Sequence, residues 1–288
     1  MSSKPQLPPS ITTPPPEVSH TLVSFPVPQV LLVTLNRPQQ LNCIPKPQHF
    51  ELEQLWEWYD AQPSLRCAVV AGAGRAFCAG ADLKDWDRSH APSAARDSRF
   101  PRGGFGGLSN RDGLKPVIAA VHGVCFGGGL EMALNCDMVV AGAGARFALP
   151  EVTIGVTALA GALPRLARCV GRHRAHEMAL AGAAYDAPTM RAWGVVNEVV
   201  AAAAEGGEAE AVVARALDWA ARIAANSPDA VAVSREGLKL GWEGVGPAQA
   251  TDLLIKGWYA RIDRGENMVE GVRSFVEKRK PVWKDSKL

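Results

Sequence analysis

The chain has 288 residues, of which 47% are hydrophobic and 21% are charged. This length can bury a substantial core without disulfides or metal. The 31 basic and 29 acidic residues leave a net charge of +2, which argues against a protein that binds nucleic acid or a membrane surface. None of the six cysteines forms a Cys-x-x-Cys pair, so we expect buried, reduced thiols and no metal site.

The N-terminus is rich in proline, with six prolines in residues 1–17. Since no apolar stretch follows them, the segment does not resemble a secretory signal, and we expect a disordered arm. No membrane span is expected either. The uncharged core run 116–130 has 15 residues and many glycines, whereas a spanning helix needs ~20 apolar residues.

The first elements alternate between strand and helix. A β-branched run predicts a strand over 30–35, and apolar residues at helical spacing predict a helix over 47–59. Residues 67–71 predict a buried strand. The stretch 86–112 has five arginines and no apolar periodicity, so we expect a long loop there, of the kind that often serves as a lid or binding segment.

Two further buried strands are predicted, over 117–121 and 137–141, with a short helix between them that begins near Leu130. Short apolar strands that alternate with helices favour an α/β fold whose sheet is covered on both sides. Beyond residue 161, one strand is expected over 195–200, and helices are expected over 161–170, 173–181, 188–193, 209–225, 228–242, 247–262 and 266–280.

Three consecutive glycines, Gly127 to Gly129, follow the strand that ends at Val121. Glycines let a ligand approach the main chain closely, and a helix that starts there directs free amides and partial positive charge at the ligand. Such amides favour an oxygen that gains negative charge during a reaction. Glu131 lies one turn into this helix. The alternative interpretation is a tight turn with a glutamate that caps its own helix.

A second glutamate, Glu151, follows Pro150 among apolar residues. A carboxylate in such surroundings is costly unless it is paired or functional. The alternative interpretation is a solvated loop glutamate. For Glu131 and for Glu151, the residues alone do not decide between the functional and the structural interpretation.

Several motifs occur in a specific order along residues 20–285. They are Leu35-Asn36-Arg37-Pro38, Phe77-Cys78-Ala79-Gly80-Ala81-Asp82-Leu83, Gly127-Gly128-Gly129-Leu130-Glu131, Pro150-Glu151 and Glu270-Gly271-Val272. Together they resemble the enoyl-CoA hydratase/isomerase (crotonase) superfamily. The resemblance implies a crotonase-like spiral of ββα units over 18–208, which holds the active site, and a C-terminal α-helical region over 209–285 that builds homotrimers, often paired into hexamers.

The resemblance also implies roles for individual residues. The amides of Ala81 and Gly128 would form an oxyanion hole, and Glu131 and Glu151 would flank the reacting double bond. Residues along the bound CoA would be Ala79, Asp82, Leu83 and Lys84. Phe275 and Lys278, in the last predicted helix, would touch the CoA nucleotide, in trimers from a neighbouring subunit.

We therefore expect a hydro-lyase that adds water to a 2-enoyl-CoA, in fatty-acid β-oxidation or related acyl-CoA metabolism. Glu131 would position and activate the water, and Glu151 would supply the α-proton. Coenzyme A would be part of the substrate, and no other cofactor is expected. A glutamate at both positions favours a hydratase over an isomerase. The alternatives are an isomerase, an acyl-CoA hydrolase or a non-catalytic CoA-binding scaffold.

Two features qualify this expectation. Leu159 and Ala162 stand where the family usually has glycines, and their bulk could reshape the acyl site. The chain ends in Ser286-Lys287-Leu288, which matches the peroxisomal address. We expect this tail to be exposed and bound by the peroxisomal import receptor. A cytoplasmic location is the alternative.

Overall fold

The computed structural model describes residues 7–84, 100–201 and 207–288. Its larger sheet has the strand order β1-β2-β3-β5-β7-β10. Only β1 runs antiparallel to its neighbour, and the other pairs are parallel. The strands are β1 (Thr21–Val27), β2 (Val30–Leu35), β3 (Cys67–Gly72), β5 (Val117–Val121), β7 (Met138–Gly142) and β10 (Glu198–Val200).

A second, smaller sheet has the order β4-β6-β8-β9, formed by β4 (Ala76–Cys78), β6 (Val124–Phe126), β8 (Arg146–Ala148) and β9 (Tyr185–Asp186). Three times the chain leaves a strand of the larger sheet and enters a strand of the smaller one within a few residues: β3 to β4, β5 to β6 and β7 to β8. This repetition forms a spiral of paired strands. The smaller sheet was not predicted, because strands of two or three residues show no periodicity.

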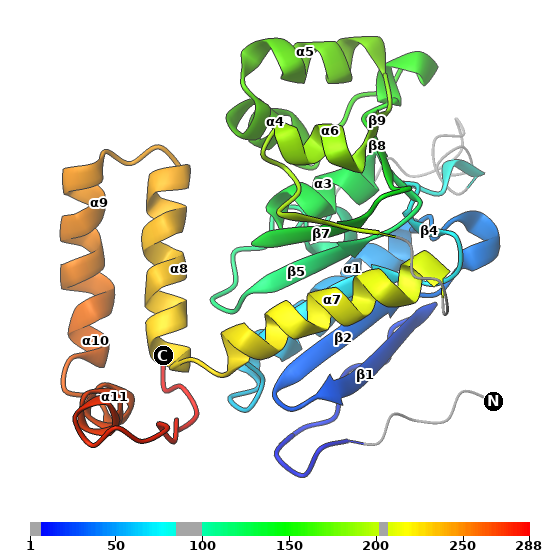
Figure 1. Ribbon diagram of the computed structural model, residues 1–288. Coiled ribbons are helices and arrows are strands. Elements are labelled where there is room, and N and C mark those ends of the chain that lie inside the picture. The colour runs from blue at the N-terminus through cyan, green and yellow to red at the C-terminus, as the bar shows by residue number, and fades with distance from the viewer. Residues whose placement is uncertain (1–6, 85–99, 202–206) are drawn as a thin grey trace.

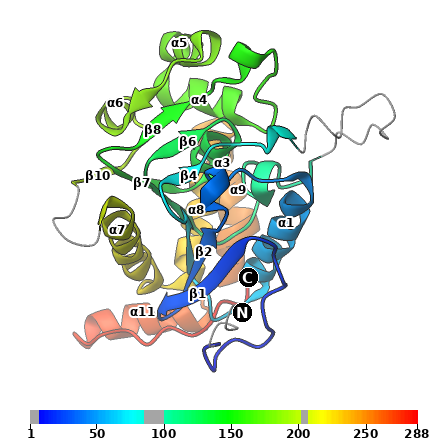
Figure 2. The ribbon, with the colours of Figure 1, turned by 90° about the vertical axis from the view of Figure 1, so that its right-hand side faces the viewer.

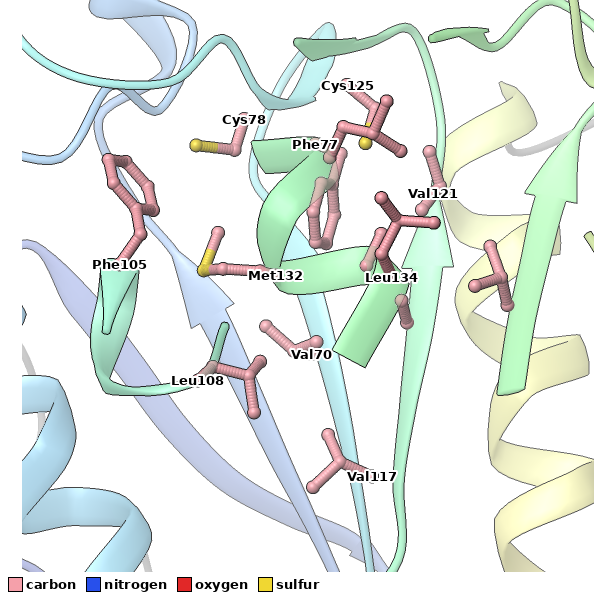
Figure 3. Close-up of a cluster of buried hydrophobic side chains, with 14 of the residues drawn as sticks. Val70, Phe77, Cys78, Phe105, Leu108, Val117, Val121, Cys125, Met132 and Leu134 are labelled. Atoms are coloured by element: carbon pink, nitrogen blue, oxygen red, sulfur yellow. The ribbon is translucent and has the colours of Figure 1, made fainter. Parts of the chain in front are cut away.

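Helices cover both faces of the larger sheet (Figures 1 and 2). Helix α7 (Gly207–Ala224) packs on one face through Val212, Ala216 and Ala220. On the other face lie α1 (Lys46–Ala61) and α3 (Gly128–Asn135). Figure 3 shows side chains of β3, β5 and α3 meeting in this second core. The prediction of an α/β fold is confirmed.

The remaining short elements surround the smaller sheet or join the strands. Helices α4 (Ala162–Val170), α5 (Arg172–Ala181) and α6 (Ala187–Ala192) lie beside it. The 3₁₀ turns are η1 (Pro38–Gln40), η2 (Phe105–Gly107) and η3 (Glu151–Ile154). No helix in the described ranges is long and apolar enough to cross a membrane.

The C-terminal helices form an arm beside the body (Figure 1). The arm contains α8 (Pro228–Trp242), α9 (Pro247–Leu253), the π-helix η4 (Leu254–Tyr259), α10 (Ala260–Ile262) and α11 (Glu266–Val276). The structure differs from the predicted boundary at 208/209, since α7 packs on the sheet and the arm begins with α8. The last helix also ends at Val276, four residues before its predicted end.

The described part of the N-terminal arm is not disordered, which corrects the prediction for residues 7–17. Trp58 of α1 and Gln62, the residue after α1, donate hydrogen bonds to Thr13, and Ser64 donates to the carbonyl of Ser10. Ile11 packs against the core. Prolines prevent regular structure here, but an extended chain can still offer its carbonyls to side chains of the body.

The C-terminal tail also folds back, contrary to the expectation that it is exposed. The Ser286 hydroxyl donates to Asp229 at 2.5 Å, and the Trp283 indole donates to the carbonyl of Ala225 at 2.8 Å. Leu288 lines a pocket together with Lys115 and Val231. Ser286 and Leu288 are therefore half-buried.

Candidate active site

Glu131 lies in the first turn of α3, and its side chain is only 4% exposed. One carboxylate oxygen, Oε1, accepts hydrogen bonds from the amides of Ala160 and Ala162, at 2.8 and 3.2 Å. The carboxylate therefore does not cap its own helix. Two main-chain donors, one in the turn before α4 and one at the first residue of α4, fix its position.

Glu151 opens the turn η3 and faces the glycine turn before α3. A Cβ on Gly127 would lie 3.0 Å from Glu151 Oε1, so any larger residue there would crowd the carboxylate. The other oxygen, Oε2, is buried without a hydrogen-bond partner in the described residues. Glu151 is thus not a solvated loop residue, and one of its oxygens is available to a reacting group.

Both carboxyl groups are poised to titrate at higher pH than usual. Burial raises the pKa of Glu131 to about 7, although the Ala162 amide opposes the shift. Burial also raises the pKa of Glu151. The charge of Glu151 further raises the pKa of Glu131, so ionisation of Glu151 disfavours ionisation of Glu131.

The amides of Ala81 and Gly128 lie on neighbouring segments. A Cβ on Gly80 would be 3.4 Å from the Gly128 nitrogen. In the described part of the chain, neither amide donates to a protein acceptor. Gly128 is the first residue of α3, where helix amides have no partner within the helix. The structure thus brings both predicted oxyanion-hole amides to the end of α3 that carries Glu131.

Sequence reasoning missed the segment from Gly103 to Ser109, which was expected to belong to a loop. These residues are buried. The Phe105 ring lies directly on Gly128, since a Cβ there would be 2.4 Å from a ring carbon. The repeated glycines around Phe105 were a signal, because Gly104, Gly106 and Gly107 all adopt positive φ. Residues 85–99 of the same predicted loop lie outside the described residues.

The predicted CoA-contacting residues near β4 form one stretch of chain. The amide of Ala79 donates to the carbonyl of Leu41, which holds the stretch against the loop after η1. Asp82 forms an ion pair with Arg37 at 3.0 Å, while Leu83 is 50% exposed and Lys84 is exposed. Along the chain, these residues flank Ala81 on both sides.

Phe275 and Lys278 are not brought to the site within one chain. They lie at the end of the arm, far from α3 in both views (Figures 1 and 2). Phe275 is 86% exposed, and Lys278 follows the end of α11 with a φ of 53°. Their predicted contact with CoA would therefore require a second chain.

The two departures from the family pattern occupy different environments. The Leu159 side chain is 79% exposed, whereas Ala162 is fully buried as the first residue of α4. Ala162 contributes its amide to Glu131. In the described ranges, no cluster of three or more His, Cys, Asp or Glu residues could hold a metal ion.

The fold and the order of these residues match known proteins. A family model described as enoyl-CoA hydratase/isomerase matches residues 28–286. Mevalonyl-coenzyme A hydratase of Beauveria bassiana is 59% identical over 285 residues, which cover 97% of this chain and 100% of that protein. The Aspergillus fumigatus protein of the same name is 49% identical, and the matched residues cover 95% of this chain and 98% of that protein.

The fold is also similar to the folds of solved structures. A crystal structure of enoyl-CoA hydratase from Mycobacterium tuberculosis superposes with a TM-score of 0.80 at 29% identity, covering 93% of this chain and 99% of that one. These similarities confirm the predicted crotonase-like spiral with its C-terminal helices and the prediction of a hydratase-type enzyme. The chain belongs to the enoyl-CoA hydratase/isomerase family.

Proposed function

We propose that the chain is a hydro-lyase that adds water to, or removes water from, an acyl-CoA thioester at Glu131 and Glu151. The main support is that the buried Glu131 and the half-buried Glu151 lie beside two amides that have no acceptor among the described residues. Thioester oxygen gains negative charge in this reaction, and one preorganised donor lowers such a barrier by about 3 kcal/mol.

Each group has a distinct task in the proposed reaction. In hydration, the ionised Glu131 accepts a proton from water as the water oxygen bonds to the β-carbon. The protonated Glu151 then gives its proton to the α-carbon, while the amides of Ala81 and Gly128 hold the thioester oxygen. Dehydration reverses these steps. Burial raises the pKa of both carboxyl groups, that of Glu131 to about 7, so a proton can remain on the pair near neutral pH.

For the substrate, the fungal relatives point to mevalonyl-CoA. The β-carbon of a mevalonyl group carries a hydroxyl and a methyl, so loss of water yields a branched, conjugated thioester. We propose this branched class over the straight-chain substrates of fatty-acid β-oxidation. Its support is identity of 59% and 49% along nearly the whole chain.

Absorbance of the conjugated thioester tests this function. Purified protein is incubated with mevalonyl-CoA and, separately, with crotonyl-CoA. We expect absorbance to rise with mevalonyl-CoA and to fall more slowly with crotonyl-CoA. No change with either substrate would contradict the hydro-lyase, and faster turnover of crotonyl-CoA would contradict the branched substrate. Release of free thiol would identify a hydrolase instead.

We also propose that the chain works as a homotrimer or hexamer. The arm exposes a row of apolar side chains on α11, with Val269, Val272, Phe275 and Val276 each at least 48% exposed. Burying this row in a second subunit is favourable. It would also carry Phe275 and Lys278 to a neighbouring site.

The last proposal concerns location. Ser286-Lys287-Leu288 would direct the protein to the peroxisome through the import receptor. Deletion of these three residues should release a fluorescently tagged protein, with the tag at its N-terminus, into the cytosol. Unchanged import of the deletion variant would contradict the address.

A further inference from the structure

Ser109 is fully buried beside the candidate site, and its hydroxyl makes two hydrogen bonds. It accepts a hydrogen bond from the amide of Phe105 at 2.8 Å and donates one to the carbonyl of Ala160 at 2.7 Å. One side chain thus joins the glycine-rich segment around Phe105 to the turn before α4. The two segments are 51 residues apart at this bond.

The first bond supports the oxyanion-hole side of the site. The Phe105 ring packs on Gly128, at the start of α3. Two side chains of α1 hold the same segment from behind: His49 accepts from the Gly106 amide, and Trp56 donates to the Gly106 carbonyl, both at 3.0 Å. Ser109 fixes the amide of Phe105, the residue immediately before Gly106.

The second bond supports the glutamate side. The peptide unit whose carbonyl belongs to Ala160 lies between the two peptide units whose amides bind Glu131. Fixing this central peptide orients both donors. Arg165 holds the next carbonyl, that of Gly161, at 3.1 Å, so the turn has a second anchor that does not depend on Ser109.

We propose that Ser109 is a positioning residue that keeps the side-chain carboxylate of Glu131 aligned with the amide of Gly128. The reaction needs both at once, because the water attacks the β-carbon while charge develops on the thioester oxygen of the same substrate. A single hydroxyl that contacts both supporting segments fixes their separation. This role rests on the hydro-lyase function proposed above.

The variants for a test are Ser109→Ala, which removes both bonds, and Ser109→Thr, which keeps the hydroxyl. Ser64→Ala is the matched control, since Ser64 is also a buried serine that donates to a backbone carbonyl, but it does so in the N-terminal arm. Each variant is measured by amide hydrogen exchange, by kcat and KM with mevalonyl-CoA, and by the pH dependence of kcat/KM.

In Ser109→Ala we expect faster exchange in segments 104–109 and 158–162. We expect kcat to fall about tenfold to a hundredfold with a smaller change in KM, as for other losses of alignment. The amides of Ala160 and Ala162 lower the pKa of Glu131, so weaker bonds should move its inflection to higher pH. Ser109→Thr should restore most of kcat.

Two results would overturn the proposal. One is exchange in both segments that equals the wild type, which would show that Ser109 bridges nothing of consequence. The other is a kcat and a pH profile that match Ser64→Ala despite faster exchange. An inactive wild type would contradict the proposed function instead, and the exchange rates would still decide whether the bridge exists.

Discussion

At the scale of single residues, opposing effects set the state of Glu131. The helix N-terminus and the amides of Ala160 and Ala162 favour its ionised form, whereas burial opposes it. Burial prevails, because the side chain is 4% exposed and the pKa rises to about 7. Glu131 therefore binds a proton in the folded chain over a pH range in which the unfolded chain has lost it.

This difference makes the free energy of unfolding depend on pH. A folded-state pKa above the unfolded value means that stability falls as pH rises from about 4.5 to about 7. Glu131→Gln removes the charge. The free energy of unfolding of this variant, relative to that of the wild type, should therefore be about 3 kcal/mol larger at pH 8 than at pH 4. Urea unfolding at both pH values measures this difference.

Glu57→Gln serves as the control, because Glu57 is exposed on α1. The free energy of unfolding of Glu57→Gln should equal that of the wild type at both pH values. An equal effect of Glu131→Gln at pH 4 and pH 8 would show that Glu131 is not held in its protonated form by burial.

The contact between Gly128 and Phe105 predicts a second effect. A methyl group at 128 would be 2.4 Å from the Phe105 ring, so Gly128→Ala must displace the ring or the amide. We expect kcat to fall about a hundredfold, as when an oxyanion donor is lost. The added change Phe105→Leu should recover part of the loss by making room.

Gly241→Ala is the control for this experiment, because a Cβ at that position of α8 has no neighbour within 4 Å. If Gly128→Ala retained full kcat, the Phe105 ring would not be what holds the amide of residue 128 in its catalytic position.

The two glutamates and two amides could be found from the sequence, because motifs in a fixed order carry them. Ser109, Phe105 and the amides of Ala160 and Ala162 could not. Every residue except proline carries an amide, so no side-chain pattern marks the ones that hold Glu131. Only folding brings residue 160 to within hydrogen-bond distance of residue 131.

At the scale of elements, the helices and strands with a clear apolar pattern were predicted, whereas those with a weak pattern were missed or predicted with errors. The apolar strands β2, β3 and β5 were predicted from their β-branched runs, and α8 was predicted with its observed ends. Strand β1 was missed. The predicted helix over 247–262 is interrupted by a π-helical segment, η4, which its apolar spacing did not reveal.

The folded-back tail is an element that local sequence reasoning expected to be exposed. Asp229→Ala removes the acceptor of the Ser286 hydroxyl. A hydrogen bond is worth about 1 kcal/mol, so the undocked population should rise roughly fivefold. Mass spectrometry during carboxypeptidase digestion should show correspondingly faster loss of Leu288.

The control here is Asp252→Ala, because Asp252 belongs to α9 of the same arm and is solvent-exposed. Equal rates of Leu288 loss in both variants would show that the Asp229 contact does not hold the tail.

At the scale of the whole molecule, the two sheets bring the site together. The amide of Ala81 follows β4, that of Gly128 follows β6, and Glu151 follows β8. These three strands are neighbours in the smaller sheet, so groups from distant parts of the chain meet at one edge. The sequence motifs predicted the candidate residues, but not the sheet that aligns them.

The arm is a second feature at this scale. If its apolar row forms a subunit interface, Val272→Asp on α11 should place a charge there and shift the mass in sedimentation from a multiple of 30.6 kDa towards a single chain. A wild-type protein that sediments as a monomer would contradict the proposed assembly.

The central claim is that Glu131 and Glu151 together move water on and off an acyl-CoA. Its most direct test is kcat/KM for mevalonyl-CoA dehydration by Glu131→Gln and Glu151→Gln, with Glu57→Gln as control. Because each glutamate has its own proton transfer, we predict a fall of at least about a hundredfold for each variant and none for the control. Wild-type rates in either variant would contradict the claim.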